Sequence, residues 1–186
     1  FGQLIDFYNG EADLRAGRIR VLHSLSFIDD PTRIMRAVRF EQRLGFTLDP
    51  RTAELITNSI PLLDRVSGDR IRHELELIYR ETDPAATLCR LVGLGALVTV
   101  HPGITCDDWF RQAHAKLNQA LTDPPWARRA APFDVLVVYL TLLTHRLSIE
   151  EIHHICERLH VRGRTVSALV QAQMLCGRLG ALHEGS

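Results

Sequence analysis

The sequence predicts an all-α fold with a short β segment at its beginning. From Ile34 onward, apolar residues recur at helical spacing, and Gly, Pro or Ser stands at each interruption of that pattern. Nothing in the second half of the chain alternates between apolar and polar residues as a strand would. The 186 residues are 46% hydrophobic and 24% charged, which excludes intrinsic disorder and provides enough apolar material for one or two packed domains.

The β segment is expected near the start of the chain. Asn9-Gly10 is a turn signal, and the short β-branched run from Arg18 to Leu22 is typical of a strand. An isolated strand is at best marginally stable in water, so we expect this one to complete a sheet whose other strands lie upstream. The sequence therefore predicts a fragment of a longer protein.

Each expected helix has its own start signal. Asp30-Pro31 places a capping side chain before a proline at the first helical position, and Gly45 ends that helix. Asp49-Pro50 and Gly68-Asp69 provide comparable starts for the second and third helices, and Asp83-Pro84 begins the fourth. The expected ranges after the first helix are 51–60, 70–81, 84–93, 107–122, 132–145, 148–159 and 163–181.

The charge and cysteine content limits the classes of function. The 22 basic and 22 acidic side chains balance, so a polyanionic partner must be bound by a local patch. All basic residues except Lys116 are arginines, which suit planar contacts with phosphates and base edges. Four widely spaced cysteines favour a reduced, cytoplasmic compartment, and the longest apolar stretch, Val135 to Leu143, is too short to cross a membrane.

The residues from Asp29 to Arg43 carry the strongest chemical signal. On an ideal helix, Arg36, Arg39 and Arg43 share one face, opposite the apolar residues. Asp30 and Arg33 are three positions apart, so they are predicted to act as one hydrogen-bonding unit in the first turn. The alternative is that Asp30 only caps the helix while Arg33 pairs with Asp29 or Asp30.

A carboxylate beside a guanidinium can select a nucleobase. The carboxylate accepts and the guanidinium donates, so the pair matches an amino group next to a ring nitrogen, the edge that cytosine and adenine present. Uracil and guanine present a carbonyl oxygen next to N–H, which leaves both protein groups unpaired. Asp30 and Arg33 are therefore predicted to admit C and A and to reject U and G.

Several motifs in order resemble a known family. They are Asp6 to Gly10, Asp13-Leu14, Gly17-Arg18-Ile19-Arg20, Asp29-Asp30-Pro31-Thr32-Arg33, Arg36-Ala37-Val38-Arg39-Phe40, Leu44-Gly45-Phe46 and Arg70-Ile71-Arg72-His73-Glu74-Leu75. Together they resemble the end of the head and the neck of a class II tRNA nucleotidyltransferase, the family of CCA-adding enzymes and bacterial poly(A) polymerases. The resemblance implies a head remnant over 1–27, a helical neck over 28–82 that binds the nucleotide base and RNA, and a tRNA-binding helical body over 83–186.

The resemblance also implies roles for individual residues. Asp30 and Arg33 would form a protein template for the incoming base, supported by Asp29, where the family usually has glutamate. The neck arginines would contact nucleotide phosphates or the RNA end; they are Arg36, Arg39, Arg43 and Arg70. The whole protein would add C, A or both from CTP and ATP to the 3′ end of tRNA.

The family's catalytic Mg²⁺ site is expected outside this chain. Nucleotidyl transfer requires metal ions, and the family's glycine-rich loop and paired aspartates precede the segment present here. We therefore expect the 186 residues alone to be inactive and to bind no metal. Two alternatives from other classes are an RNA-binding module without transfer activity and a helical interaction scaffold.

Three further groups of residues invite functional interpretations. His153, His154, Glu157 and His160 have helical metal-ligand spacing, although they equally fit the edge of an amphipathic helix. Trp126, Arg128 and Arg129 loosely match a nucleic-acid groove and are predicted as a tRNA contact. His101-Pro102 and Asp107-Asp108-Trp109 are interpreted as a loop and a helix start.

Overall fold

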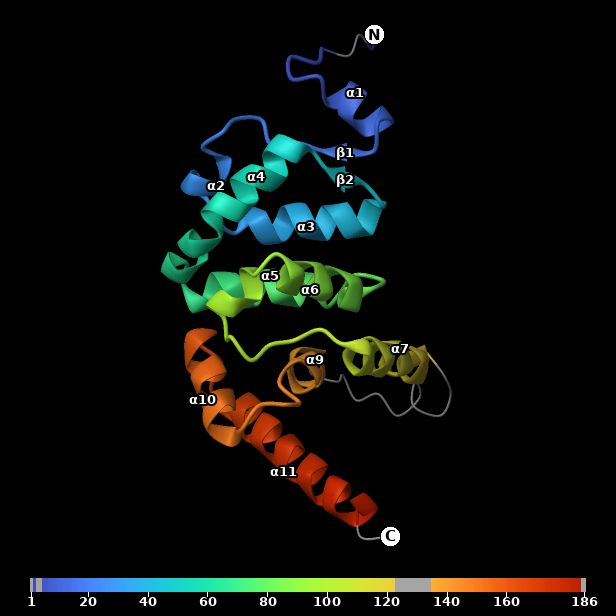
Figure 1. The fold of residues 1–186 in the computed structure, drawn as a ribbon, viewed down its shortest axis with the longest axis vertical. Helices are drawn as coiled ribbons and strands as arrows, with labels where there is room; N and C mark the ends of the chain where they lie inside the picture. The colour runs from blue at the N-terminus through green and yellow to red at the C-terminus, as the bar shows by residue number, and fades with distance from the viewer. Residues whose placement is uncertain (1, 3–4, 123–134, 185–186) are drawn as a thin grey trace.

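The computed structural model describes residues 2, 5–122 and 135–184 and confirms an all-α architecture with a minimal sheet. Figure 1 shows an elongated molecule in which the helices are stacked in layers, with the N-terminus at one end and α11 projecting at the other. The helices are α1 (Gly10–Arg15), α2 (Ser26–Asp29), α3 (Arg33–Leu44), α4 (Pro50–Ser59), α5 (Gly68–Ile78), α6 (Pro84–Gly93), α7 (Asp108–Thr122), α9 (Val135–Leu143), α10 (Ile149–Arg158) and α11 (Arg164–Glu184). Two 3-10 turns, η1 (Ile60–Arg65) and η2 (Ala96–Thr99), follow α4 and α6. Within the described ranges no helix is long and apolar enough to span a membrane.

The sheet pairs two short strands that lie on either side of α3 in the chain. β1 (Arg18–Ile19) runs parallel to β2 (Thr47–Leu48), with Arg18 opposite Thr47. The strand that pairs with β1 therefore lies downstream in the sequence, and the expectation of an upstream partner is wrong for this pair. Gly45 adopts a left-handed conformation (φ 63°) that ends α3 and turns the chain back toward β1.

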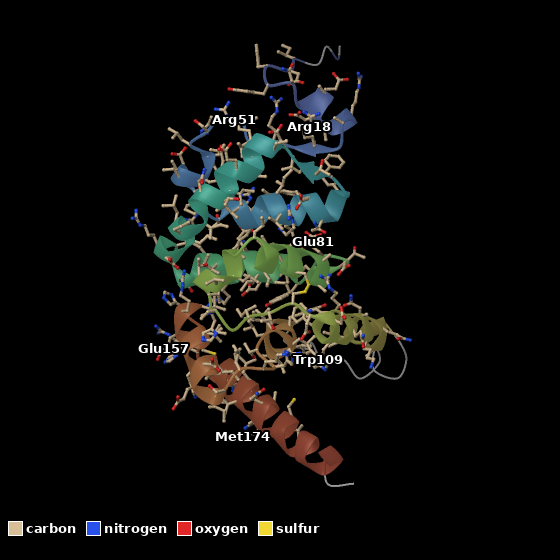
Figure 2. The ribbon with its side chains drawn as sticks, in the orientation of Figure 1. Arg18, Arg51, Glu81, Trp109, Glu157 and Met174 are labelled. Carbon is tan, nitrogen blue, oxygen red and sulfur yellow. A yellow bond between two sulfur atoms is a disulfide. The ribbon has the colours of Figure 1, made fainter. Side chains whose placement is uncertain are left out.

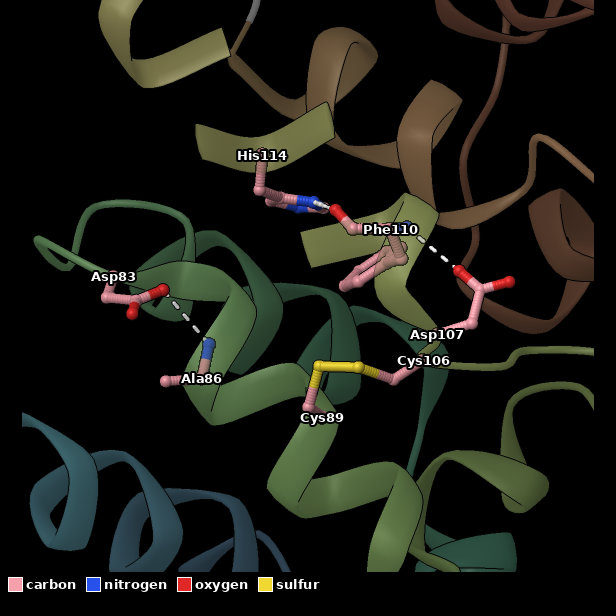
Figure 3. The surroundings of a disulfide bond; sticks show 7 residues. All are labelled: Asp83, Ala86, Cys89, Cys106, Asp107, Phe110 and His114. Atoms are coloured by element: carbon pink, nitrogen blue, oxygen red, sulfur yellow. Dashed lines mark hydrogen bonds between the residues drawn. A yellow bond between two sulfur atoms is a disulfide. The ribbon is translucent and has the colours of Figure 1, made fainter. Parts of the chain in front are cut away.

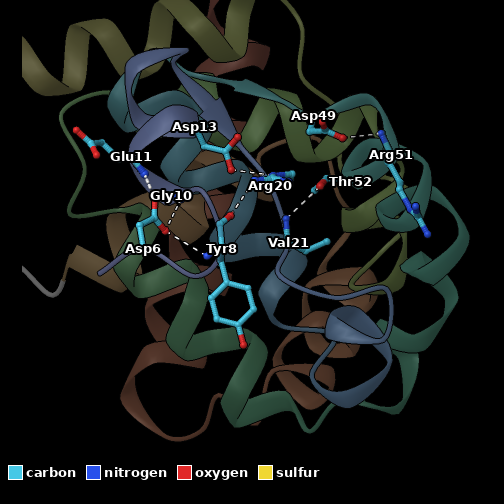
Figure 4. Close-up of polar contacts among 10 residues, drawn as sticks. All are labelled: Asp6, Tyr8, Gly10, Glu11, Asp13, Arg20, Val21, Asp49, Arg51 and Thr52. Carbon is cyan, nitrogen blue, oxygen red and sulfur yellow. Dashed lines mark hydrogen bonds and ion pairs between the residues drawn. The ribbon is translucent and has the colours of Figure 1, made fainter. Parts of the chain in front are cut away.

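Polar contacts organise the segment before β1 (Figure 4). The Asp6 carboxylate accepts hydrogen bonds from the main-chain N–H groups of Tyr8, Gly10 and Glu11 at 2.9 to 3.2 Å, which supports the start of α1. Arg20 donates to Asp13 Oδ2 at 2.8 Å and to the Tyr8 carbonyl at 2.9 Å. These contacts explain α1, a helix that the apolar pattern did not indicate.

The start of α3 differs from the predicted one. Asp30 is extended (φ −147°, ψ 97°) and ends α2, while α3 begins at Arg33. Its carboxylate accepts hydrogen bonds from the Thr32 main-chain N–H at 3.1 Å and from the Thr32 hydroxyl at 2.7 Å, so it folds the turn between the two helices. Asp30 and Arg33 therefore do not share a first helical turn.

One hydrophobic core runs through the layers. It extends from Phe27 to Leu169 and includes fully buried side chains such as Ile34, Ile71 and Leu88 on α3, α5 and α6. The core continues across residues 82 and 83, where the resemblance places the boundary between neck and body. That division remains a proposal.

The C-terminal end of α10 joins the later helices to η1 and α5. The Arg158 guanidinium donates to the carbonyls of Leu63 at 2.9 Å, Val66 at 3.0 Å and Thr99 at 3.2 Å. Arg72 on α5 donates in turn to the Leu159 carbonyl at 3.1 Å. Hydrogen bonds at the end of α10 therefore connect it to η1, η2 and α5.

The close approach at this joint leads to a prediction about Gly68. A Cβ atom at Gly68 would lie 2.1 Å from the Arg158 carbonyl oxygen, so Gly68→Ala requires the two backbones to separate. We expect a loss of about 1–3 kcal/mol in the free energy of unfolding, as for other overpacked sites. Gly93→Ala is the control, because nothing lies within 4 Å of its added Cβ. Equal urea midpoints for the two variants would contradict the packing described.

The cysteines depart from the expectation of a reduced set. Cys89 on α6 and Cys106 before α7 form a disulfide, with their Cα atoms 5.2 Å apart (Figure 3). Cys156 is free and buried, and Cys176 is free and exposed. The sequence alone did not indicate this pair, because η2 and the following loop bring Cys89 and Cys106 together only in the folded chain.

Candidate functional site

A cavity of about 450 Å³ opens between the turn before α3, α3 itself and α5. Charged side chains of both signs line it because the polar edges of α3 and α5 meet there. The lining residues are Asp30, Thr32, Arg36, Arg39, Asp69, Arg70, His73, Glu74 and Leu77.

Asp30 is held rigidly at this cavity. Besides its two bonds from Thr32, its Oδ1 atom lies 2.6 Å from Nη2 of Arg70. Burial opposes ionisation of Asp30, but the Thr32 hydrogen bonds and the Arg70 charge outweigh it and lower its pKa below the usual value. The carboxylate is therefore a fixed, ionised acceptor at neutral pH.

The partner of Asp30 is Arg70, and Arg33 lies elsewhere. Arg33 is exposed, does not line this cavity and donates from Nη1 to the Ser26 carbonyl at 3.3 Å. Asp29 is also exposed, with Oδ2 4.0 Å from His23 Nε2. In the part of the chain that the structure describes, no ion pair joins Arg33 to Asp29 or Asp30.

The predicted arginine face of α3 is partly neutralised. Arg39 is buried and donates from Nη1 to Glu81 Oε1 at 3.0 Å, and Nε of Arg43 lies 3.8 Å from Glu81 Oε2. Arg36 remains exposed at the cavity. The helical periodicity placed these side chains correctly, but it contained no information on Glu81, which approaches from the turn after α5.

Glu74 is a cavity residue that the base-selection argument did not single out. It is 6% exposed, and its Oε2 atom has no hydrogen-bond partner among the described residues, as is also true of Arg39 Nε. Burial raises the pKa of Glu74, opposed by the charges of Arg39, Arg36 and His73. The sequence could have indicated Glu74 as a cavity residue, because it follows Arg70 by four residues and that spacing places both side chains on one face of α5.

The raised pKa predicts a pH-dependent effect of Glu74→Gln. The folded state binds the Glu74 proton more tightly than the unfolded state, so this residue's contribution to stability falls as pH rises from the ordinary value of 4.5 through the raised one. Glu74→Gln should therefore raise the Tm at pH 7.5, and the gain should shrink toward pH 4.5. Exposed Glu54→Gln is the control. A Glu74→Gln effect that is the same at every pH would contradict this prediction.

The other candidate groups lie apart from the cavity or at its edge. His153, His154 and Glu157 are exposed on α10, whereas Nδ1 of His160 lies 2.8 Å from Asp69 Oδ2. Within the described ranges, no three metal-ligating side chains come together. The predicted tRNA contact at Trp126, Arg128 and Arg129 lies outside the described residues.

The loop and helix start predicted around residues 101–109 are confirmed. His101 accepts from the Gly103 main-chain N–H at 3.1 Å within a turn. Asp107 accepts from the Phe110 N–H at 2.8 Å at the start of α7, shown in Figure 3.

Comparisons with known proteins show which sequences and folds this chain is similar to. Residues 45–107 match a family model described as a probable RNA- and SrmB-binding site of polymerase A. Over 163 residues the chain is 39% identical to the A-adding tRNA nucleotidyltransferase of Geobacter sulfurreducens, covering 87% of this chain and 18% of that protein.

Solved structures show the same fold. An apo form of a CCA-adding enzyme superimposes with a TM-score of 0.82 at 30% identity, covering 97% of this chain and 42% of that one. The Thermotoga maritima CCA-adding enzyme complexed with tRNA gives a TM-score of 0.74 at 31% identity, covering 89% and 40%. This chain thus spans less than half the length of these relatives. By fold and sequence, it belongs to the tRNA nucleotidyltransferase and poly(A) polymerase family.

Proposed function

We propose that the protein containing this chain adds C, A or both from CTP and ATP to the 3′ end of tRNA. In this proposal the chain supplies base selection and part of the RNA-binding surface. The observation that carries it is Asp30, a carboxylate held ionised at a cavity that Arg36, Arg39 and Arg70 also line, within a segment similar to A-adding and CCA-adding enzymes. Related solved structures are described as complexes with ATP, CTP and tRNA.

The residues divide between base and phosphate contacts. Asp30 accepts a hydrogen bond from the amino group of adenine or cytosine, and Arg33 swings from Ser26 to donate to the ring nitrogen. Asp29, beside them, supports the orientation of this pair. Arg70 fixes Asp30 and, with Arg36, neutralises phosphate charge.

The remaining predicted residues act around this centre. Arg39 and Arg43 shape the α3 surface through Glu81 and retain the proposed contact with phosphate or RNA. Trp126, Arg128 and Arg129 are proposed to contact the acceptor stem. The head remnant, neck and body remain assigned to 1–27, 28–82 and 83–186.

The transfer step itself requires metal ions that these residues do not fit. Mg²⁺ would bridge phosphate oxygens and activate the attacking hydroxyl. Asp30, the one carboxylate at the motif that faces the cavity, is already bound by Arg70 and Thr32. We therefore place the Mg²⁺ site in the rest of the protein and derive no step through it here.

Nucleotide addition by the longer protein tests this function. The polypeptide that includes this chain and its upstream region is incubated with tRNAs ending before C, before CC and before A, with each nucleoside triphosphate separately. We expect incorporation of C, A or both and little of U or G. tRNA binding without incorporation would favour an RNA-binding module, and equal use of all four nucleotides would contradict base selection.

A further inference from the structure

An aromatic pair lies on the body surface, at the end of the family-model match. Trp109, in the first turn of α7, is 45% exposed although tryptophan is strongly apolar. Its indole stacks on His145, just after α9, with ring centroids 3.6 Å apart and planes 16° from parallel. Figure 2 labels Trp109 between α7 and α9. His145 covers one face of the indole, and 45% of the Trp109 surface is still exposed to solvent.

His145 provides a flat and uncharged support. Its Nδ1 atom lies 2.9 Å from the Leu142 carbonyl, and its Nε2 atom accepts from Arg146 Nε at 3.1 Å. Those partners assign the proton to Nδ1 and leave Nε2 as the acceptor. Burial lowers the pKa of His145, which keeps the imidazole neutral.

Contacts from three elements fix the orientation of this pair. Asp107 caps α7 and forms an ion pair with Arg146. Gln173 on α11 donates to the carbonyls of His145 at 3.2 Å and Leu147 at 2.8 Å. The surface is thus organised before any partner arrives, which reduces the entropic cost of binding.

We propose that the free face of Trp109 stacks on an unpaired base of bound RNA. Base stacking on an aromatic ring tolerates any base, and an adjacent arginine adds attraction for the backbone. Arg146 lies beside the rings, because its Nε atom donates to Nε2 of the stacked His145. A protein interface is a poorer fit, because Trp109 follows the charged Asp108 in the chain and its stacking partner His145 is bonded to the charged Arg146.

The proposal rests on RNA binding by this protein and deepens it. Residues 45–107 match the RNA-binding family model, and that match ends at Asp107, which caps the helix carrying Trp109. The stacking surface therefore continues a segment already related to RNA binding. Neither Trp109 nor His145 lines the cavity around Asp30.

Fluorescence of Trp109 tests the contact without disturbing it. Trp126→Phe leaves Trp109 as the only tryptophan in the chain. Titration with a single-stranded oligoadenylate should quench its emission saturably, whereas a blunt RNA duplex of equal length should quench it much less. Unchanged emission at saturating single-stranded RNA would overturn the proposal.

Affinity measurements on the 186-residue chain give a second test. Trp109→Ala should weaken binding of the oligoadenylate by about 5- to 150-fold, whereas Trp109→Phe should keep most of the affinity. Leu175→Ala on α11 removes another exposed apolar side chain and should change nothing. Circular dichroism and Tm measurements check that each variant is folded. If Trp109→Ala does not fold, the affinity of Trp109→Phe and the fluorescence titration decide whether Trp109 contacts RNA.

The outcomes separate this inference from the proposed function. Full affinity in a folded Trp109→Ala variant, with loss in Arg36→Ala, would overturn the stacking contact and leave the proposed function standing. Absence of RNA binding in every variant would contradict both. A change in oligomeric state without a change in RNA affinity would assign Trp109 to a protein contact and overturn the inference.

Discussion

Asp30→Ala and Arg33→Ala in the nucleotide-adding protein are expected to relax selection against UTP and GTP. Loss of one good base contact is worth about 1–3 kcal/mol, equivalent to roughly a 5- to 150-fold change in the preference for ATP over GTP and for CTP over UTP. The measurement is kcat/KM for each of the four nucleotides. Asp30→Ala should have the larger effect, because Arg70 and Thr32 already hold its carboxylate in place.

A matched control distinguishes base contact from general disturbance of the cavity. Asp69 is also a carboxylate at this cavity, but both of its oxygens are bound, Oδ1 by Arg72 and Oδ2 by His160, whereas the contacts of Asp30 all go to Oδ1, so Asp69→Ala should keep the nucleotide preference. Arg70→Ala should weaken selection indirectly, because it releases Asp30. Unchanged preference in both the Asp30 and the Arg33 variants would refute the template assignment.

Arg158→Ala is expected to cause the largest loss of stability. Its guanidinium satisfies three main-chain carbonyls from η1, the segment after it and η2, and hydrogen bonds to charged groups each contribute about 1.5–3 kcal/mol. Allowing for incomplete additivity, we expect a fall of about 3–5 kcal/mol in the free energy of unfolding, measured by urea denaturation. Arg158→Lys should retain only part of the stability that Arg158→Ala loses, because one ammonium cannot reach all three carbonyls.

Arg162→Ala provides the comparison for this effect. Arg162 is exposed in the turn between α10 and α11, and surface substitutions of this kind usually change stability by less than about 0.5 kcal/mol. Similar urea midpoints for the Arg158 and Arg162 alanine variants would show that the three carbonyl contacts do not stabilise the fold.

Helix positions were predictable because their signals are local. Asp49 accepts a hydrogen bond from the Arg51 N–H at 2.9 Å, and Asp83 accepts one from Ala86 at 3.0 Å, so two capping predictions from Asp-Pro pairs are confirmed. The same signal failed at Asp30, because its carboxylate bonds Thr32 within a turn and α3 starts two residues beyond Pro31. A capping residue next to proline does not by itself specify which of these structures forms.

Contacts across long stretches of sequence could not be predicted in the same way. Arg70 meets Asp30 across 40 positions, and Glu81 meets Arg39 across 42. Both depend on how α3 and α5 pack, which periodicity on one helix does not determine. The disulfide between Cys89 and Cys106 has the same origin. The sequence motifs thus identified the segment that lines the cavity. Which charged side chains pair within that segment could be learned only from the folded structure.

The salt dependence of tRNA binding by the 186-residue chain tests most directly whether the cavity surface between α3 and α5 meets RNA. Each phosphate neutralised releases counterions, so log affinity should fall linearly with log salt concentration, with a slope near the number of phosphate contacts. The account predicts a shallower slope, by about 1 to 2, for the Arg36→Ala/Arg70→Ala variant than for the wild type. It also predicts an unchanged slope for the control Arg162→Ala/Arg164→Ala. Equal slopes for the cavity variant and the wild type would contradict it.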